Sequence, residues 1–358
     1  MRLRRLWLTD FRNYTSAEVE LAPAGLTVVA GGNGQGKTNL IEAVAYLATL
    51  DSFRGAPAEA LVRTGCSTAV VRAEGERSGR SLLVEAEINT AGRSRTLVNH
   101  QPLRRAADLL GAVRVSLFSP DDLELVKGGP AARRRYLDDA LVGLHPRHGA
   151  ARADLERVLR QRNALLKQCK GRLDGPAEST LDVWDTKLAL SGEELAAARE
   201  ELVTTLEGPL AKAYDQLAGT PADVTAVYER SWQGPLGAAL AAARADDVRR
   251  GLSTVGPHRD ELRLSISTMP ARTHASQGEQ RSLALALRLA AHRAVTDAVG
   301  EPPVLLLDDV FSELDAERTD ALVAHLPDGQ VVLTTAGAVP PGAFPALTLR
   351  VRDGLVLA

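Results

Sequence analysis

Residues 31–38, which read Gly-Gly-Asn-Gly-Gln-Gly-Lys-Thr, are of types that can hold a chain of phosphates. Their spacing fits the pattern of a P-loop. Glycines let the backbone approach phosphate oxygens, the lysine can reach the β- and γ-phosphates, and the threonine hydroxyl can bind Mg²⁺. We therefore predict an ATP and Mg²⁺ site, with Thr38 on the metal, Lys37 also assisting catalysis, and the nucleotide held by Gly31, Gly32, Asn33, Gly34, Gln35, Gly36, Lys37, Thr38 and Asn39.

The residues on either side predict the two elements that must position this loop. The apolar run Leu26–Ala30 indicates a short buried strand before it. After it, Leu40, Val44 and Leu47 follow helical spacing, so the loop would open a helix whose free N–H groups face an anion. The alternative is a glycine-rich turn that only caps a helix.

A pair of carboxylates near the C-terminus supplies the second half of such a site. The apolar run Val304–Leu307 predicts a strand buried on both faces, and it ends in Asp308 and Asp309. Asp308 would hold the metal through water, and Asp309 would orient and polarise the water that attacks the γ-phosphate. The alternative is that two aspartates simply end a strand at a turn.

The stretch Ser276–Gln280 lies between these halves and has two interpretations. Ser276 followed by Glu279 is a capping box, which could merely begin a helix. Ser-x-Gly-x-Gln also resembles the signature motif of ABC-type ATPases, and Ser312–Asp315 resembles their D-loop. In that class the motif binds the γ-phosphate of ATP held by a second subunit, so the resemblance implies an ATP-dependent homodimer in which Ser276 serves catalysis and Ser276, Gln277 and Gly278 contact nucleotide.

Composition sets wide limits on the class of protein. The chain has 358 residues, 45% of them apolar, and a formal charge of −2, so any contact with nucleic acid must come from a local patch. Two cysteines without metal or redox spacing fit a reducing, cytoplasmic compartment. We find no export signal and no apolar stretch long enough to span a membrane.

Seven dispersed stretches, taken in order, resemble the RecF family of bacterial DNA repair proteins. They are Phe11–Tyr14, the P-loop, Ser52–Arg54, Gly129-Pro130, Arg133–Asp138, Gln161–Asn163 and Gly256–Asp260. The resemblance implies that Arg12 and Asn13 lie near the nucleotide; the alternative for Arg12 is a cation on a surface turn. It also implies that ATP closes a dimer on DNA, which directs RecR and RecO, hence RecA, to gaps in replication-linked repair and the SOS response.

The expected fold is an α/β ABC-type ATPase head with a mixed sheet, divided in sequence by a helical lobe. The head would take residues 1–120 and 252–358, and the lobe 121–251. Alternating residues predict strands at 6–8 and 17–21 and a hairpin within 82–98. Leucine stripes predict long helices in the lobe, with a short strand at Val224–Tyr228 and breaks at 145–146, 171–176, 208–209 and 219–221.

The lobe carries the clearest charge feature. Between Arg147 and Arg172 there are eight basic and two acidic residues, a net charge of +6. Arg133–Arg135 precede this stripe. Such cations can bind DNA phosphates without regard to sequence, and we assign contacts to Arg134, Arg152, Arg157 and Arg160. A solvated helix face is the alternative. His258 and Arg259 could touch nucleotide or DNA, or could belong to a turn held by Pro257.

Two departures from ABC-type patterns affect the expected chemistry. Residues 113–125 contain no glutamine to position water, which leaves Asp121 or Asp122 for that role. Thr334 and Thr335 stand where many ABC ATPases carry a histidine, so we expect slow hydrolysis. The resemblance to the RecF family implies a weak ATPase that DNA stimulates. The rival functions are a transporter ATPase subunit, which has no use for the helical lobe, and a P-loop kinase, which leaves Ser276–Gln280 without a role.

Overall fold

The computed structural model describes residues 1–104, 106–219 and 221–357, and the chain divides into two compact units. The first unit comprises Met1–Leu123, Pro209–Ala222 and Ser276–Ala358, and the second comprises Glu124–Gly208 and Asp223–Ala275. The expected head and lobe boundaries stay a prediction. The second unit contains residues 252–275, which the prediction gave to the head. The first unit contains residues 209–222, which the prediction gave to the lobe.

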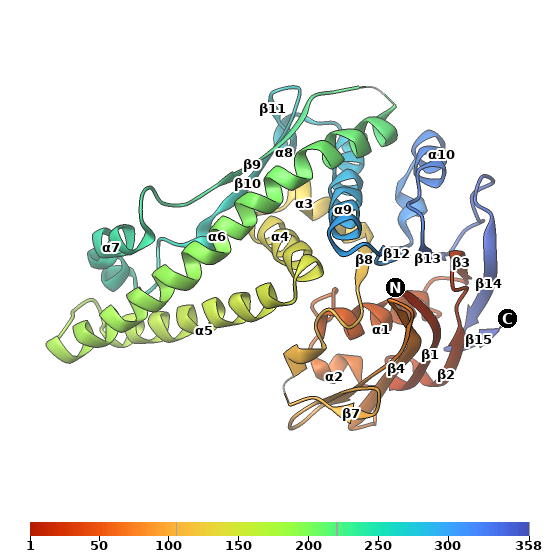
Figure 1. The fold of residues 1–358 in the computed structure, drawn as a ribbon, viewed down its shortest axis with the longest axis horizontal. Coiled ribbons are helices and arrows are strands. Elements are labelled where there is room, and N and C mark those ends of the chain that lie inside the picture. The colour runs from red at the N-terminus through yellow and green to blue at the C-terminus, as the bar shows by residue number, and fades with distance from the viewer. Residues whose placement is uncertain (105, 220, 358) are drawn as a thin grey trace. The chain divides into compact units, whose positions relative to one another are not determined.

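A six-stranded, mostly parallel sheet in the first unit carries the P-loop (Figure 1). In spatial order its strands are β15 (Leu355–Leu357), β14 (Pro345–Arg352), β3 (Gly25–Ala30), β13 (Gln330–Thr335), β12 (Val304–Asp308) and β8 (Val115–Phe118). Only the β14–β15 pair is antiparallel. Strands β3 and β12 are largely apolar, and in β13 the polar residues are buried as well, so the three strands have almost no exposed side chain. This is expected for parallel strands covered on both faces.

An antiparallel sheet forms the other layer of this unit. Its order is β2 (Tyr14–Glu20), β1 (Arg2–Phe11), β4 (Thr68–Arg77), β5 (Arg80–Asn89), β6 (Arg95–Val98) and β7 (Gln101–Pro102). The predicted N-terminal strands and the hairpin within 82–98 are confirmed. The mixed α/β class is also confirmed.

Helix α1 (Lys37–Thr49) packs against both sheets of the first unit. Leu40, Ile41, Val44 and Leu47 are fully buried in one core with residues from each sheet. This burial on nearly all sides fixes the helix that begins at the P-loop. The other helices of the unit are α2 (Ala58–Leu61), the last part of α6 (Gly175–Ala218), α9 (Gln277–Val299), α10 (Ala316–Ala324) and the 3₁₀ turns η1 (Ala106–Leu109), η2 (Pro120–Leu123) and η4 (Val310–Glu313).

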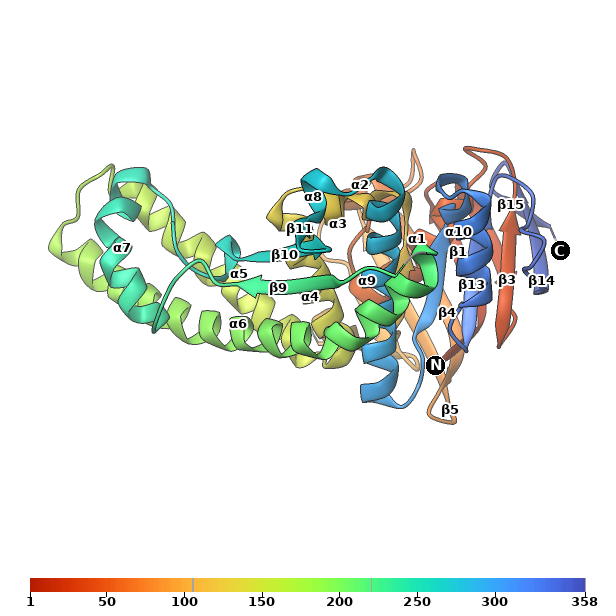
Figure 2. The same ribbon diagram turned by 90° about the horizontal axis from the view of Figure 1, so that it is seen from above.

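The second unit is mainly helical, as Figure 2 shows. Its elements are α3 (Glu124–Lys127), α4 (Pro130–Leu144), α5 (Arg147–Gln168), the first part of α6 (Gly175–Ala218), α7 (Leu236–Arg250), η3 (Pro257–Arg259) and α8 (Ala271–His274). A small sheet adds β9 (Val224–Glu229), β10 (Glu261–Ile266) and β11 (Met269–Pro270), which confirms the short strand predicted at Val224–Tyr228.

The predicted break at 208–209 is wrong, because α6 runs through Pro209. Proline removes one backbone hydrogen bond and crowds the preceding turn, and the helix continues where burial outweighs that cost. Leu206 and Leu210, on either side of the proline, are both buried. The breaks at 145–146 and 171–176 are confirmed; that at 219–221 includes Thr220, which lies outside the described residues, and α6 ends at Ala218.

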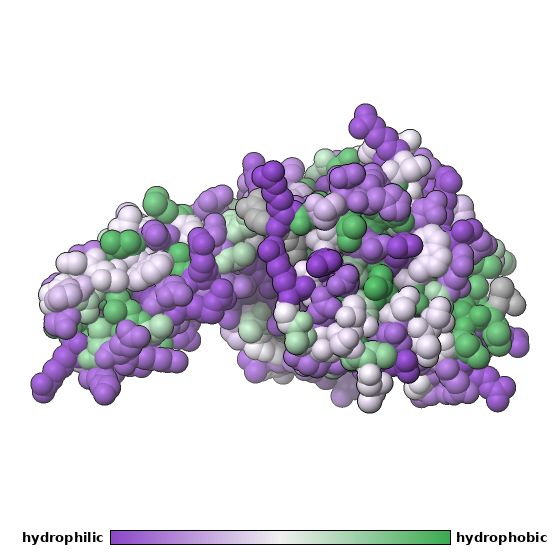
Figure 3. All heavy atoms as spheres, turned by 90° about the horizontal axis from the view of Figure 1, so that it is seen from below, coloured by the Kyte–Doolittle hydropathy of each residue, from purple (hydrophilic) through white to green (hydrophobic). Residues whose placement is uncertain are grey.

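None of the helices in the described part of the chain is long and apolar enough to cross a membrane. Hydrophilic side chains cover most of the face drawn in Figure 3, with hydrophobic ones in separate groups.

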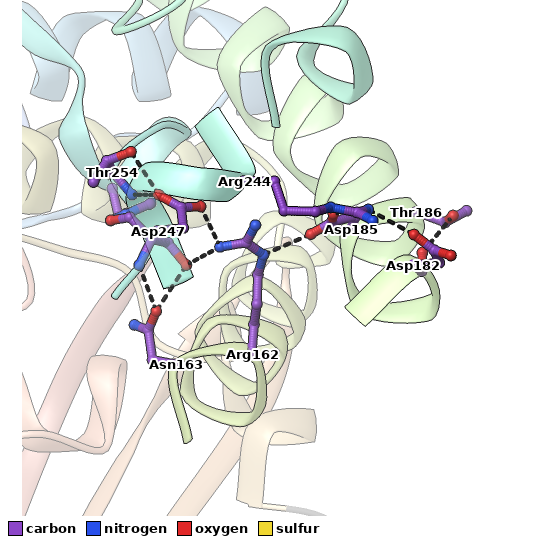
Figure 4. A network of polar contacts seen from close by, with 10 residues as sticks. Arg162, Asn163, Asp182, Asp185, Thr186, Arg244, Asp247 and Thr254 are labelled. Atoms are coloured by element: carbon purple, nitrogen blue, oxygen red, sulfur yellow. Dashed lines mark hydrogen bonds and ion pairs between the residues drawn. The ribbon is translucent and has the colours of Figure 1, made fainter. Parts of the chain in front are cut away.

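One arginine of the basic stripe lies in the interior of the second unit. Arg162 on α5 is fully buried and donates from Nε to Asp185 of α6 at 2.7 Å. Its Nη1 donates to Asp247 of α7 at 2.7 Å and to the Ser253 hydroxyl at 2.8 Å (Figure 4). Arg162 therefore joins three helices and is no part of an exposed stripe.

We expect Arg162→Met to lower the free energy of unfolding by about 3–5 kcal/mol, because it leaves the fully buried Asp247 carboxylate without its cation. Arg157→Met on the same helix is the control: Arg157 is 66% exposed, so its loss should change stability by less than about 0.5 kcal/mol. Urea unfolding followed by circular dichroism measures both. Equal losses in the two variants would contradict the structural role of Arg162.

Candidate nucleotide-binding site

The P-loop joins the end of β3 to the start of α1, and its glycines meet real steric demands. Gly36 has φ 119° and caps α1; a Cβ there would lie 2.8 Å and 2.9 Å from side-chain atoms of Asn13 and Tyr14. A Cβ on Gly31 would lie 2.3 Å from the carbonyl oxygen of Val351. The loop backbone is therefore packed against its neighbours in a conformation that side chains would prevent.

The turn between β1 and β2 holds the loop from the side. Asn13 donates from Nδ2 to the carbonyl of Gln35 at 3.0 Å, and the buried Tyr14 hydroxyl donates to the carbonyl of Gly36 at 3.0 Å. Asn39, on the first turn of α1, donates to Asn13 Oδ1 at 2.8 Å. These bonds tie the end of the phosphate loop and the first turn of α1 to the β1–β2 turn, which lies more than 20 positions earlier in the sequence.

Arg12 in the same turn is anchored and is not a loose surface cation. Its Nε and Nη2 both donate to the Glu42 carboxylate at 2.7 Å, and Nη1 donates to the carbonyl of Ala60 at 2.8 Å. The Arg12 side chain is 15% exposed and Glu42 is fully buried. Arg12 thus joins α1 to the chain around α2 while lining the same cleft as the P-loop.

Two threonines hold the first of the paired carboxylates. Asp308 Oδ1 accepts hydrogen bonds from Thr38 Oγ1 at 2.9 Å and from Thr334 Oγ1 at 2.7 Å. Burial raises the pKa of Asp308, and the bonds from Thr334 and Thr38 oppose that rise. A threonine hydroxyl beside a carboxylate oxygen is a donor set that suits Mg²⁺, with water and phosphate as its remaining ligands.

The second carboxylate, Asp309, leaves the strand in a left-handed conformation. Its φ is 47°, and its backbone N–H donates to Thr334 Oγ1 at 3.0 Å. This turn directs Asp309 into the cleft, whereas Asp308 lies behind the cleft wall on Thr38. Thr334, which was noted in the sequence only for replacing a histidine, therefore contacts both aspartates.

A cleft of about 730 Å³ opens in front of the loop, within the range of roughly 300–1,000 Å³ that small-molecule sites occupy. Its walls carry four cations, from Lys37, Arg12, Arg54 and Arg63, and one carboxylate, from Asp309. The cleft therefore favours an anion. Lys37 Nζ donates to the carbonyl of Gly32 at 2.8 Å. The described residues that line it are Arg12, Asn13, Thr15, Asn33, Gly34, Gly36, Lys37, Thr38, Asn39, Arg54, Ala60, Val62, Arg63, Thr64 and Asp309.

These residues fit a nucleoside triphosphate with Mg²⁺. Backbone N–H groups at the start of a buried helix, a lysine and a threonine would surround the phosphates. Among the described residues there is no group of three or more His, Cys, Asp or Glu that could hold a metal, so a cation beside Thr38 and Asp308 would need phosphate and water oxygens.

Sequence reasoning missed one wall of the cleft. This wall is formed by α2 and the residues just after it, a segment that matches no local motif. Its lining residues are Ala60, Val62, Arg63 and Thr64. Arg63 donates from Nε to Asp10 at 2.7 Å, which places this segment beside the β1–β2 turn. Together with the bond from Arg12 to the carbonyl of Ala60, this long-range contact brings the segment to the nucleotide loop. Arg54 was noted within a family-like stretch but was not assigned to the site.

Ser276 forms the predicted capping box at the start of α9. Its Oγ accepts the backbone N–H of Glu279 at 3.3 Å, and the Glu279 carboxylate accepts the backbone N–H of Ser276 at 2.7 Å. These bonds lower the pKa of Glu279, with the charge of Arg318 as a smaller cause. Ser276 and Gln277 are exposed and, like Gly278, do not line the cleft that the P-loop forms in the same chain.

Asp122, which was considered for positioning water, instead bonds to Arg288 and Ser119. Its Oδ1 accepts from Nε and Nη2 of Arg288 at 3.1 and 2.6 Å, and its Oδ2 accepts the backbone N–H of Ser119 at 3.0 Å. The carboxylate therefore ties the end of β8 to helix α9. Asp121, the other residue considered for that role, is exposed.

The cations assigned to DNA differ in their surroundings. Arg134 is half-buried and donates to the carbonyl of Asp260 at 2.7 Å; Arg152 pairs with Asp139 and Glu156. Arg157 and Arg160 are 66% and 69% exposed and pair with Asp154 and Glu156 on their own helix. Exposed pairs of this kind exchange readily with other anions.

His258 and Arg259 belong to a turn. His258 Nε2 and the Arg259 guanidinium both bond the carbonyl of Ser253, at 3.1–3.3 Å. Burial lowers the pKa of His258 to about 4, so its ring is neutral near pH 7. The arrangement favours the structural alternative for His258.

Known proteins resemble the chain along its whole length. Residues 2–335 match the family model described as RecF/RecN/SMC N terminal domain. The DNA replication and repair protein RecF of Streptomyces avermitilis is 44% identical over 372 residues, with 99% of each chain covered. The RecF of Kineococcus radiotolerans is 45% identical over 374 residues, with 97% of this chain and 95% of the relative covered.

A solved structure shows the same fold. It is described as the recombination mediator protein RecF with ATP in the RecFOR pathway, and it matches with a TM-score of 0.91 and 28% identity over 100% of this chain and 98% of the other. Family model, sequence and fold agree over nearly the same residues. The chain therefore belongs to the RecF family of DNA replication and repair proteins.

Proposed function

We propose that the chain binds Mg²⁺–ATP in the cleft of its first unit and uses ATP to close a homodimer on DNA, with slow hydrolysis releasing it. One observation carries most of this proposal: Thr38 and Asp308 are 270 positions apart, yet they are hydrogen-bonded beside a positively charged cleft that begins at a P-loop. The solved relative described as RecF-ATP adds support for the nucleotide.

ATP would supply the γ-phosphate whose cleavage ends the closed state. Lys37 binds its β- and γ-phosphates, and the backbone of residues 31–36 surrounds the phosphate chain. Thr38 and Asp308 hold the metal, and Asp309 orients and polarises the attacking water from the cleft side. Arg12 and Asn13 form the wall beside the loop.

The exposed capping box supports a second, composite part of the site. Ser276, Gln277 and Gly278 do not line the cleft of their own chain, so they are available to a nucleotide held by another subunit. In a twofold dimer each such surface is used twice, which gives two ATP molecules between two chains.

The wider role follows from the family. We propose that the closed dimer holds DNA without regard to sequence through exposed cations such as Arg157 and Arg160, and that DNA stimulates a weak ATPase. Its partners would be RecO and RecR, in a cytoplasmic pathway that brings the recombinase to gaps during replication-linked repair and supports the SOS response. The RecFOR pathway named for the solved relative supports this choice over the transporter and kinase alternatives.

Lys37→Met tests the phosphate loop. We expect at least a tenfold loss of ATP affinity, about 1.4 kcal/mol, because the ammonium that meets the phosphates is gone while the glycines remain. Titration with a fluorescent ATP analogue measures the affinity, and Lys212→Met, at an exposed position on α6, serves as the control. Unchanged affinity in Lys37→Met would remove the P-loop from the proposal.

Asp309→Asn separates hydrolysis from binding. The variant keeps Thr38 and Asp308 for the metal but loses the negative charge that polarises water, so ATP should bind normally while turnover falls at least tenfold. Phosphate release and nucleotide binding are measured on the same preparation. Asp320→Asn, at an exposed position on α10, should hydrolyse ATP at the wild-type rate. If Asp309→Asn does so too, another residue activates the water.

Charge reversal on α5 tests the DNA surface. Arg157→Glu with Arg160→Glu should weaken DNA binding and reduce the slope of log affinity against log salt by up to about 2, since two phosphate contacts are lost. The matched control is Arg249→Glu with Arg250→Glu on α7, two arginines that are 70% and 57% exposed. Equal salt slopes for both double variants would leave the α5 stripe as a solvated face.

A further inference from the structure

Helix α10 places an arginine directly on the turn that begins α9. The guanidinium of Arg318 rests on Gly278: a Cβ at that glycine would lie 2.7 Å from Nη2 and 2.8 Å from Cζ of Arg318. Both residues belong to the first unit. A side chain at position 278 would displace the guanidinium from this place.

Two contacts fix the direction of the Arg318 side chain. Nε donates to the hydroxyl of Ser282, a fully buried residue one turn along α9, at 3.1 Å. Nη1 donates to the carboxylate of Asp315, which also accepts the backbone N–H of Arg318 at 2.9 Å and so caps α10. Within the described part of the chain, Nη2 has no acceptor, and the side chain is 23% exposed. One edge of the guanidinium is therefore free beside Gly278.

The charges around Gly278 make this free edge significant. The neighbouring Glu279 carries a carboxylate that is held ionised by its capping bonds. Arg281, the next cation on α9, is occupied by Glu313, with Nη1 on the carbonyl and Nη2 on the carboxylate. An anion that approached Ser276 and Gly278 would meet the charge of Glu279, and Arg318 is the cation placed to offset it.

We propose that Arg318 binds the γ-phosphate of the ATP molecule held by the partner subunit. This inference rests on the proposed composite site and adds one specific residue to it. Guanidinium suits the contact because its planar N–H groups bind phosphate oxygens, and a side chain already fixed by Ser282 and Asp315 loses little freedom on binding. Arg318 would thus distinguish ATP from ADP when the dimer closes.

The test compares dimerisation of the full chain with a non-hydrolysable ATP analogue and with ADP, by light scattering over a range of protein concentrations. Wild type should dimerise at least tenfold more tightly with the ATP analogue than with ADP. Arg318→Gln should lose most of that preference, whereas Arg318→Lys should keep part of it, because the ammonium retains the charge. The affinity of the monomer for the ATP analogue should stay unchanged in every variant, since Lys37, Thr38 and Asp308 are intact.

Ser282→Ala is the control for a purely structural role. It removes the Nε contact but keeps the cation and its bond to Asp315, so it should lose much less of the preference for the ATP analogue than Arg318→Gln does. If Arg318→Gln keeps the preference for the ATP analogue, the inference is overturned while the composite site stands. An equal loss of preference in Ser282→Ala and Arg318→Gln would also overturn the inference, because it would point to a structural role. If the wild type fails to dimerise with either nucleotide, the proposed function itself fails.

Discussion

The hydrogen bonds that converge on Asp308 hold the nucleotide site together. Thr38 follows the P-loop strand, and Thr334 lies near the end of β13, the strand between β3 and β12. The three side chains meet because β3, β13 and β12 are adjacent and parallel. Their C-terminal ends then lie at one edge of the sheet, which is where open α/β sheets bind ligands. A shift in the pairing of any one strand would separate the Thr38 hydroxyl, proposed to bind the metal, from the Asp308 carboxylate.

Charged side chains serve two different purposes in the chain. Arg162 and Arg199 in the second unit are buried and bonded to carboxylates of other elements, and each leaves a buried acid behind if it is removed. Arg54 and Lys37 in the first unit line an open cleft, where their charge can meet a ligand. Sequence shows all of these as basic residues, and only the burial and the partners separate the two groups.

Local patterns were sufficient for much of the fold and for the phosphate loop. The apolar runs before Gly31 and Asp308 identified β3 and β12, and the Ser276–Glu279 pair identified the start of α9, because each signal lies within a few residues. Features that depend on contacts between distant parts of the chain could not be predicted from local patterns. Arg162 looked like its exposed neighbours, Pro209 looked like a helix end, and Val62 and Arg63 had no motif that could tie them to the cleft.

The central claim is that ATP is sandwiched between two chains, so that each site takes its P-loop from one and Ser276 from the other. Mixing Lys37→Met with Ser276→Arg, two variants that we expect to hydrolyse little ATP on their own, tests this most directly. In a mixed dimer one site combines the intact loop of the Ser276→Arg chain with the intact Ser276 of the Lys37→Met chain, while the other site carries both lesions. We predict that the mixture hydrolyses ATP well above the sum of the separate variants, with a maximum near equal proportions. A mixture that never exceeds this sum, at concentrations where the wild type dimerises, would contradict the composite site.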